Sequence, residues 1–266
     1  MTTHKPEDGA SAIAYKEYGS GSSIILLHGF CGSSRYWDKI IPYLAGAYRV
    51  IVPDLRGHGK STAPESTVYP MEAFADDVER LMTELGVEQP IVLGHSLGGY
   101  ITLALAEKLG DQLAGFGLIH STALSDTEEG RASRDKGIAT INNEGIAAFV
   151  EGLIPKLFAP ENLTAQPEIV AWTKEIGRGT SAHGAAATQE GMKLRVDRNH
   201  VLEESTQPVL LVAGAQDGVI PAERTFSVNK DSFTCVKLES AGHMSMLEAP
   251  EELAHVILTF CHHCSP

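Results

Sequence analysis

The fold is decided by residues 91–100, which read Ile-Val-Leu-Gly-His-Ser-Leu-Gly-Gly-Tyr. The run opens with three apolar residues that predict a short buried strand, and residues 101–108 predict a helix directly after it. Ser96 lies at the apex of the turn between Gly94 and Gly98, where strand and helix come too close for a Cβ atom. A glycine-rich turn could contain a serine by chance, so the flanking elements carry the argument. We expect a strained serine whose hydroxyl is exposed at a helix N-terminus.

Outward from this turn, short apolar strands alternate with helices. The pattern predicts strands at residues 12–18, 23–27, 48–52, 91–93, 113–119, 208–213 and 233–238, and helices at 37–44, 71–85 and 101–108 and after Pro221 and Pro250. Such alternation is typical of the α/β class, in which a mainly parallel sheet is flanked by helices.

The alternation stops between residues 123 and 205. This region contains helix-like segments at 126–141, 144–153, 167–176 and 181–194, and no strand pattern separates them. Ordinary crossover helices would need such a strand. We therefore predict a core formed by residues 1–122 and 206–266, with an all-helical cap at 123–205.

Composition narrows the class of partner. The chain has 266 residues, of which 43% are hydrophobic, and a net charge of -13 from 21 basic and 34 acidic residues. Without a basic run, nucleic acid and an anionic membrane are not expected as partners. The apolar runs have strand length and residues 1–11 are polar, so we predict a soluble, cytoplasmic protein that acts on a small molecule. Monomer and homodimer both stay open.

The four cysteines do not predict a disulfide framework in a chain of this length. Residues 261–264 read Cys-His-His-Cys and are all of metal-ligand type, but four consecutive residues cannot easily surround one tetrahedral ion. We expect an exposed tail there, and no metal or organic cofactor.

Three residues with complementary chemistry follow predicted strands. Ser96 is a weak nucleophile that needs a base, and the base needs an acid to orient it. Asp217 and His243 follow the last two strands, so the chain order is serine, acid, histidine. Because the ends of parallel strands gather at one edge of the sheet, we predict that these residues form a catalytic triad. Asp126, after the preceding strand, is an alternative acid.

These motifs together resemble the α/β-hydrolase superfamily over nearly the whole chain. The residues that carry the resemblance are His-Gly-Phe at 28–30, Asp-Leu-Arg-Gly-His-Gly-Lys-Ser at 54–61, Gly-His-Ser-Leu-Gly-Gly at 94–99, Asp217 and Gly242-His243. The resemblance implies an oxyanion hole formed by the backbone N–H groups of Phe30 and Leu97. It also implies a structural role for the loop at 54–61, which lacks phosphate-loop spacing.

The branch that the chain resembles contains small bacterial carboxylesterases and enol-lactonases. This resemblance implies a carboxylic ester hydrolase that acts on small to medium acyl esters through an acyl-enzyme. A serine nucleophile argues against haloalkane dehalogenase and epoxide hydrolase chemistry, which use a carboxylate. Lactone hydrolysis, C–C bond hydrolysis, perhydrolysis and menaquinone-pathway synthase chemistry stay open. The last of these enzymes has an arginine where this chain has Tyr100. A receptor-like or scaffolding member with a disused triad is a third class.

The sequence contains weaker signals for the substrate pocket than for the catalytic residues. Residues near the motifs give the candidates for substrate binding: Gly29, Cys31, Trp37, His120, Ser121 and Val219. Although Tyr100 replaces the arginine of the menaquinone-pathway synthase, other arginines in or near the cap could still bind a carboxylate, and the charge of the pocket would decide whether they do: Arg131, Arg134, Arg178, Arg195 and Arg198.

Overall fold

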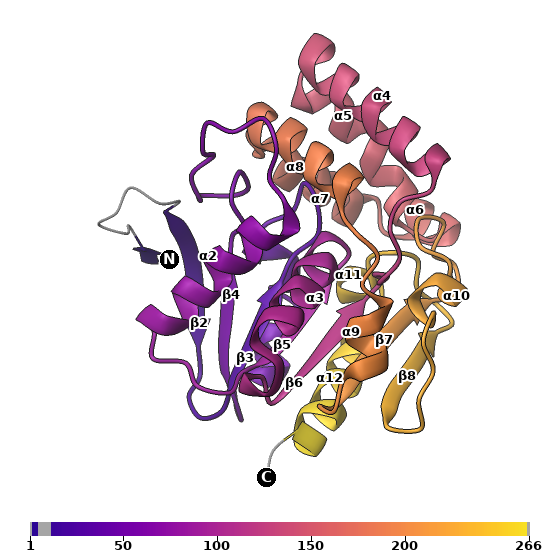
Figure 1. Cartoon of the computed structure of the whole chain (residues 1–266). Coiled ribbons are helices and arrows are strands. Elements are labelled where there is room, and N and C mark those ends of the chain that lie inside the picture. Colours follow the sequence, from indigo (N-terminus) through magenta and orange to yellow (C-terminus); the bar gives the residue numbers. More distant parts are fainter. Residues whose placement is uncertain (1, 5–11, 265–266) are drawn as a thin grey trace.

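An eight-stranded sheet forms the centre of the computed structural model, which describes residues 2–4 and 12–264 (Figure 1). The strands are β1 (Thr2–His4), β2 (Ile13–Tyr18), β3 (Ser23–Leu27), β4 (Arg49–Pro53), β5 (Ile91–His95), β6 (Gly115–Ile119), β7 (Val209–Gly214) and β8 (Phe233–Leu238). Their order is β1-β2-β4-β3-β5-β6-β7-β8. The pairs β1–β2 and β2–β4 are antiparallel and the other pairs are parallel. The predicted α/β-hydrolase fold is confirmed.

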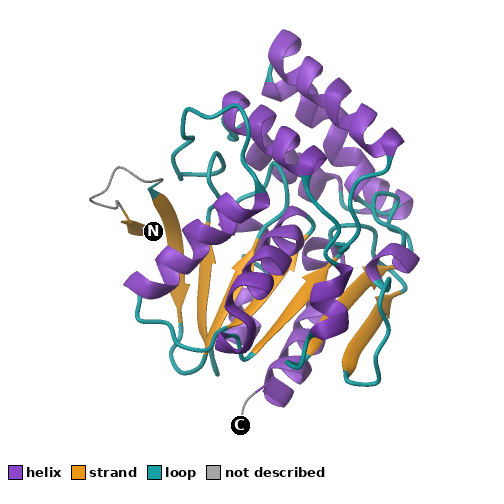
Figure 2. Cartoon of the chain, viewed as in Figure 1, coloured by secondary structure: helices purple, strands orange, loops and turns teal. Residues whose placement is uncertain are grey.

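Helices cover both faces of the sheet, as Figure 2 shows in purple and orange. Successive residues of β3 point to opposite faces, so Ile25 and Leu27 join one apolar cluster while Ile24 and Leu26 join the other. The first cluster contains the buried sides of α2 (Met71–Glu84) and α3 (Leu97–Leu109). The second contains those of α1 (Ile41–Leu44) and α12 (Pro250–Cys264). Burial on both faces explains why these strands are continuously apolar.

The cap helices lie together beyond one end of the sheet (Figure 1). They are α4 (Glu128–Glu144), α5 (Ile146–Leu153), α6 (Pro160–Ala165), α7 (Pro167–Arg178) and α8 (Ala182–Leu194), with the 3₁₀ turn η3 (Ile154–Leu157) after α5. The first helix begins two residues later than predicted, since the side chain of Thr127 caps it by accepting from the N–H of Gly130. It ends at Glu144, because the next residue, Gly145, has a φ of 87° that a helix does not allow.

The cap meets the core at points where two backbones come very close. A Cβ at Gly191 of α8 would lie 1.7 Å from the backbone oxygen of Tyr69. At the C-terminal end of the predicted cap, α9 (Asn199–Glu204) lies beside α3 (Figure 1). Arg198, before α9, forms ion pairs with Glu72 of α2 and Glu107 of α3.

The short helices complete the chain. They are η1 (Ser34–Trp37), η2 (Gly110–Gln112), α10 (Ala222–Thr225) and α11 (Ser245–Glu248). Strand β1 was not predicted, because a three-residue polar edge strand has no apolar signal.

The expectation of an exposed C-terminal tail is wrong. Residues 261–264 continue α12, where Cys261 is buried against the sheet and Cys264 is half-buried, while His262 and His263 are exposed. The helix therefore places the two thiols on its more buried side and the two imidazoles on its exposed side. Among the described residues, no helix has the length and apolar character that crossing a membrane would require.

Candidate active site

Ser96 stands on the sharp turn between β5 and α3. Its backbone has φ 50° and ψ -111°, a strained conformation for a residue with a side chain. A Cβ at Gly94 would lie 2.1 Å from the backbone oxygen of Gly98, and one at Gly98 would lie 2.5 Å from that of Leu27. The two glycines therefore allow the close approach that the sequence predicted. Ser96 is half-buried, and within residues 2–4 and 12–264 its hydroxyl makes no hydrogen bond.

Asp217 and His243 are in direct contact at the ends of β7 and β8. The Nδ1 atom of His243 lies 2.7 Å from the Oδ2 atom of Asp217, and both residues are buried. The other carboxylate oxygen accepts from the backbone N–H groups of Val219 and Ile220, at 2.8 and 2.9 Å. Burial raises the pKa of Asp217, but the charge of His243 and the hydrogen bonds from the histidines outweigh burial and hold this pKa well below its usual range. An ionised Asp217 can only accept, so His243 carries its proton on Nδ1 and presents Nε2 as the basic nitrogen.

Asp126, the alternative acid, does not contact His243. Its carboxylate pairs with the Nε atom of Arg134 at 2.8 Å and with the Nη1 atom of Arg195 at 2.7 Å. The structure thus brings Asp217 and not Asp126 to the histidine.

His120 is a second imidazole on the same carboxylate. Its Nδ1 atom lies 3.2 Å from the Oδ2 atom of Asp217, and its Nε2 atom lies 2.7 Å from the hydroxyl of Ser245. Burial lowers the pKa of His120 below its usual value. A neutral His120 therefore donates from Nδ1 to Asp217 and accepts from Ser245 through Nε2.

The same three residues form the one cluster of metal-ligand type that the described residues contain, namely His120, Asp217 and His243. Both imidazoles face a single carboxylate oxygen at hydrogen-bonding distance. A metal ion bound about 2 Å from both a histidine nitrogen and a carboxylate oxygen would keep these two atoms further apart than the 2.7 Å between His243 and Asp217. The spacing fits a hydrogen-bonded triad better than a metal site.

The loop that carries His243 is held from two sides. His95 lies 2.8 Å through its Nε2 atom from the backbone oxygen of His243, and burial lowers the pKa of His95 well below the usual value. The Oε2 atom of Glu248 accepts from the N–H groups of Gly242 and Met244, at 2.9 and 3.0 Å. Sequence reasoning missed Glu248, whose only signal is its place five residues after the histidine.

The loop after β3 lies against the serine turn. A Cβ at Gly29 would lie 2.5 Å from the Nδ1 atom of His95 and 3.4 Å from the Cβ of Ser96. His28 fixes this loop by accepting from the N–H of Leu55 at 2.9 Å. In the described part of the chain, the N–H groups of Phe30 and Leu97 donate no hydrogen bond.

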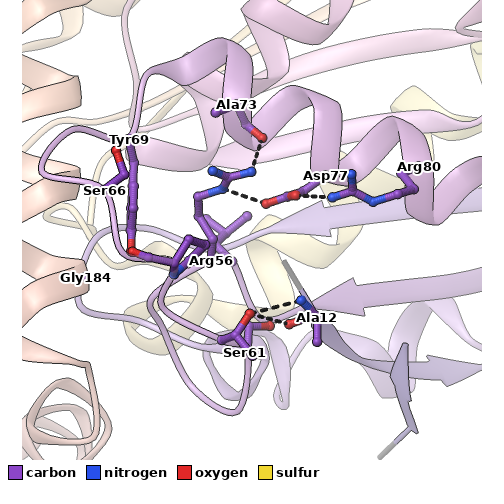
Figure 3. A network of polar contacts seen from close by, with 12 residues as sticks. Ala12, Arg56, Ser61, Ser66, Tyr69, Ala73, Asp77, Arg80 and Gly184 are labelled. Carbon is purple, nitrogen blue, oxygen red and sulfur yellow. Dashed lines mark hydrogen bonds and ion pairs between the residues drawn. The ribbon is translucent and has the colours of Figure 1, made fainter. Parts of the chain in front are cut away.

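The loop at 54–61 is tied to the core. Arg56 donates from Nε to Asp77 at 2.6 Å and from Nη2 to the backbone oxygen of Ala73 at 2.7 Å, both on α2 (Figure 3). Arg80 forms an ion pair with Asp77 as well. The guanidinium of Arg56 is thus engaged with α2.

A cavity of about 580 Å³ lies between the core loops and the cap. Its lining includes Phe30 and Val219 among the predicted site residues, together with Tyr100 at the start of α3. Ser96 and His243 are not part of this lining, so the cavity lies beside these two residues, next to the loops at Phe30 and at Gly218.

The other pocket candidates lie elsewhere. Trp37 and Cys31 are fully buried in the apolar cluster on the α12 side of the sheet, and His120 contacts Asp217 instead of the cavity. Ser121 donates to the backbone oxygen of Ser96 at 2.7 Å, and Gly29 packs against His95. None of these five residues lines the cavity.

Comparison with known proteins agrees with this architecture. The model of the alpha/beta hydrolase fold family matches residues 23–250. An esterase structure from Thermogutta terrifontis, with malate bound, is 28% identical with a TM-score of 0.94, and the match covers 100% of both chains. The 2-(acetamidomethylene)succinate hydrolase of Mesorhizobium japonicum is 26% identical over 95% of this chain and 92% of its own. The enol-lactonase of Burkholderia xenovorans LB400, 22% identical with a TM-score of 0.88 over 95% and 97% of the two chains, shares the fold.

The fold and the site define a hydrolase of the α/β type. The chain belongs to the alpha/beta hydrolase fold family.

Proposed function

We propose that this protein is a carboxylic ester hydrolase with Ser96 as nucleophile, His243 as general base and Asp217 as the acid that orients it. The observation that carries the proposal is the 2.7 Å contact between His243 and Asp217 at the strand ends next to the strained serine turn. This contact leaves Nε2 of the imidazole available for the serine proton.

The reaction follows from these positions. Ser96 Oγ attacks the ester carbonyl while its proton passes to Nε2 of His243, and the carbonyl oxygen becomes an oxyanion. The N–H groups of Phe30 and Leu97, which have no other partner among the described residues, receive this charge. The intermediate collapses, the alcohol leaves with the proton from His243, and water then releases the acid from Ser96 by the same route.

Two relatives support the proposal. The esterase from T. terrifontis aligns over the full length of both chains. The relative from M. japonicum is also named as a hydrolase, and the two names mention malate and a substituted succinate.

The test is hydrolysis of 4-nitrophenyl esters from acetate to laurate by the wild type and by Ser96→Ala. We expect turnover by the wild type, a loss of at least about a thousandfold in the variant, and a preferred chain length set by the cavity. A variant as active as the wild type would exclude Ser96 as the nucleophile. A folded wild type that hydrolyses none of these esters would contradict the assignment as an esterase.

A further inference from the structure

The cavity beside the triad carries a positive charge that the chain as a whole does not have. Its lining contains five cationic side chains, Arg134, Lys136, Lys156, Arg195 and Arg224, and one carboxylate, Asp126. The complete chain has 34 acidic and only 21 basic residues. A cavity lined by an average sample of this chain would have the opposite sign.

The ion pairs within the cavity leave this charge uncompensated. Asp126 pairs with both Arg134 and Arg195, so one negative charge faces two positive ones. Arg224 donates to the backbone oxygen of Ser125 at 3.2 Å, which has no formal charge. Arg224, Lys136 and Lys156 have no ion pair with any residue that the structure describes.

Arg195 is the buried member of the group. Its side chain is only 4% exposed, its guanidinium lies 4.0 Å from the ring centre of Tyr100, and its Nε atom has no hydrogen-bond partner in the described structure. Its Nη atoms donate to the backbone oxygens of Met192 and Leu124 and pair with Asp126, a carboxylate that Arg134 shares. An anion in the cavity would be attracted by the charge of Arg195 and of the surrounding cations.

Apolar side chains line the same cavity. Phe30 comes from the loop next to the serine turn, and Phe149 and Leu153 come from α5. The two aromatic rings are 5.8 Å apart. A molecule that extends from the triad into the cavity would therefore meet an apolar section and also a cationic one.

From this charge distribution we propose that the substrate carries a carboxylate group in addition to the ester that is cleaved. Arg224, Arg134 and the two lysines bind this carboxylate, and Arg195 contributes its positive charge. The inference deepens the proposed ester hydrolase function and rests on it. Arg131 and Arg178, which the sequence also suggested, do not line the cavity, and Arg178 is paired with Glu151 and Glu175 at the surface.

The test compares two aryl esters with acyl chains of equal length, mono-4-nitrophenyl adipate, which is anionic, and 4-nitrophenyl hexanoate, which is neutral. For the wild type we expect kcat/KM to favour the adipate by about tenfold, and this preference to weaken as the salt concentration rises. Arg224→Gln should lower the ratio of the two kcat/KM values by about tenfold, and Lys156→Gln should lower it less, because this lysine is more exposed. The matched control is Arg131→Gln, an exposed arginine of α4 outside the cavity, which should leave the ratio unchanged.

The outcomes separate this inference from the function on which it rests. If both esters are cleaved through Ser96 with equal kcat/KM, the carboxylate inference is overturned and the esterase proposal stands. If neither ester is cleaved, the esterase proposal fails. Calorimetric titration with adipate then tests the anion site independently of catalysis. Binding that Arg224→Gln weakens and Arg131→Gln does not would support the site, and absence of adipate binding to the folded wild type would overturn it.

Discussion

The contact between His120 and Asp217 allows a sharp test of how the proposed triad is held in position. Asp217 is buried and accepts from Val219, Ile220, His243 and His120, so removal of His120 deletes one donor from an ionised group. A hydrogen bond to a charged acceptor contributes about 1.5–3 kcal/mol, and the length of 3.2 Å favours the lower end. If about 1.4 kcal/mol of this is lost from the transition state, kcat/KM falls about tenfold. We expect this loss in His120→Ala.

The matched variant is His120→Asn. His120 has a φ of 49°, a conformation that asparagine tolerates better than alanine, and the amide NH₂ can replace the Nδ1 donor. We expect His120→Asn to retain kcat/KM within about threefold of the wild type. Ser245→Ala, which removes only the hydroxyl partner on the far side of the ring, should behave like it.

The comparison of the two variants distinguishes positioning from general loss of structure. If His120 acts by donating to Asp217, His120→Asn should keep most of the kcat/KM that His120→Ala loses, while thermal unfolding shows that both variants are folded. The reasoning is refuted if His120→Ala keeps the kcat/KM of the wild type, or if both variants are folded and impaired alike.

Three other properties can be checked directly. Gly94→Ala should prevent stable folding, because its Cβ would lie 2.1 Å from a backbone oxygen of α3, whereas the control Gly46→Ala, with nothing within 4 Å, should unfold at the wild-type temperature. Burial lowers the pKa of His28 to about 4, so below about pH 6.5 the unfolded chain binds a proton that the folded chain does not. The free energy of unfolding in urea should therefore fall by up to about 1.4 kcal/mol per pH unit between pH 6 and 4, and His28→Asn should reduce this slope; equal slopes would contradict the assignment. Burial raises the pKa of the Cys31 thiol, so iodoacetamide should label the exposed Cys235 in the folded protein, and mass spectrometry should find Cys31 labelled only after unfolding.

The strands and the serine turn could be predicted because their signals are local. Strands buried on both faces must be apolar throughout, and Gly94 and Gly98 are required by the backbones on either side of Ser96. The contact between Asp217 and His243 could be predicted from their order in the chain and from the rule that the ends of parallel strands gather at one edge of the sheet. The roles of all three residues stay predictions until activity is measured.

The direction of each side chain behind the triad could not be predicted. Trp37 and Cys31 are close in sequence to the loop at 28–30, for which an oxyanion hole is proposed, yet both are buried in the apolar core. Whether Arg134 or Arg131 of α4 faces the cavity depends on how the helix is rotated against its neighbours. That rotation is set by tertiary packing, which helical periodicity alone does not determine because α4 is largely polar on all sides.

One carboxylate connects the cap with the part of the core that carries the histidine. The Oε1 atom of Glu248 accepts from the N–H of Ala159 and from the side chain of Asn162 in the cap, at 2.7 and 2.8 Å. Its Oε2 atom accepts from the N–H groups on either side of His243. Because both oxygens belong to one carboxylate group, a displacement of the segment at 159–162 would also displace the loop that carries His243. The segment at 159–162 is therefore linked through Glu248 to the loop that carries His243, and other residues of the predicted cap supply charge to the cavity.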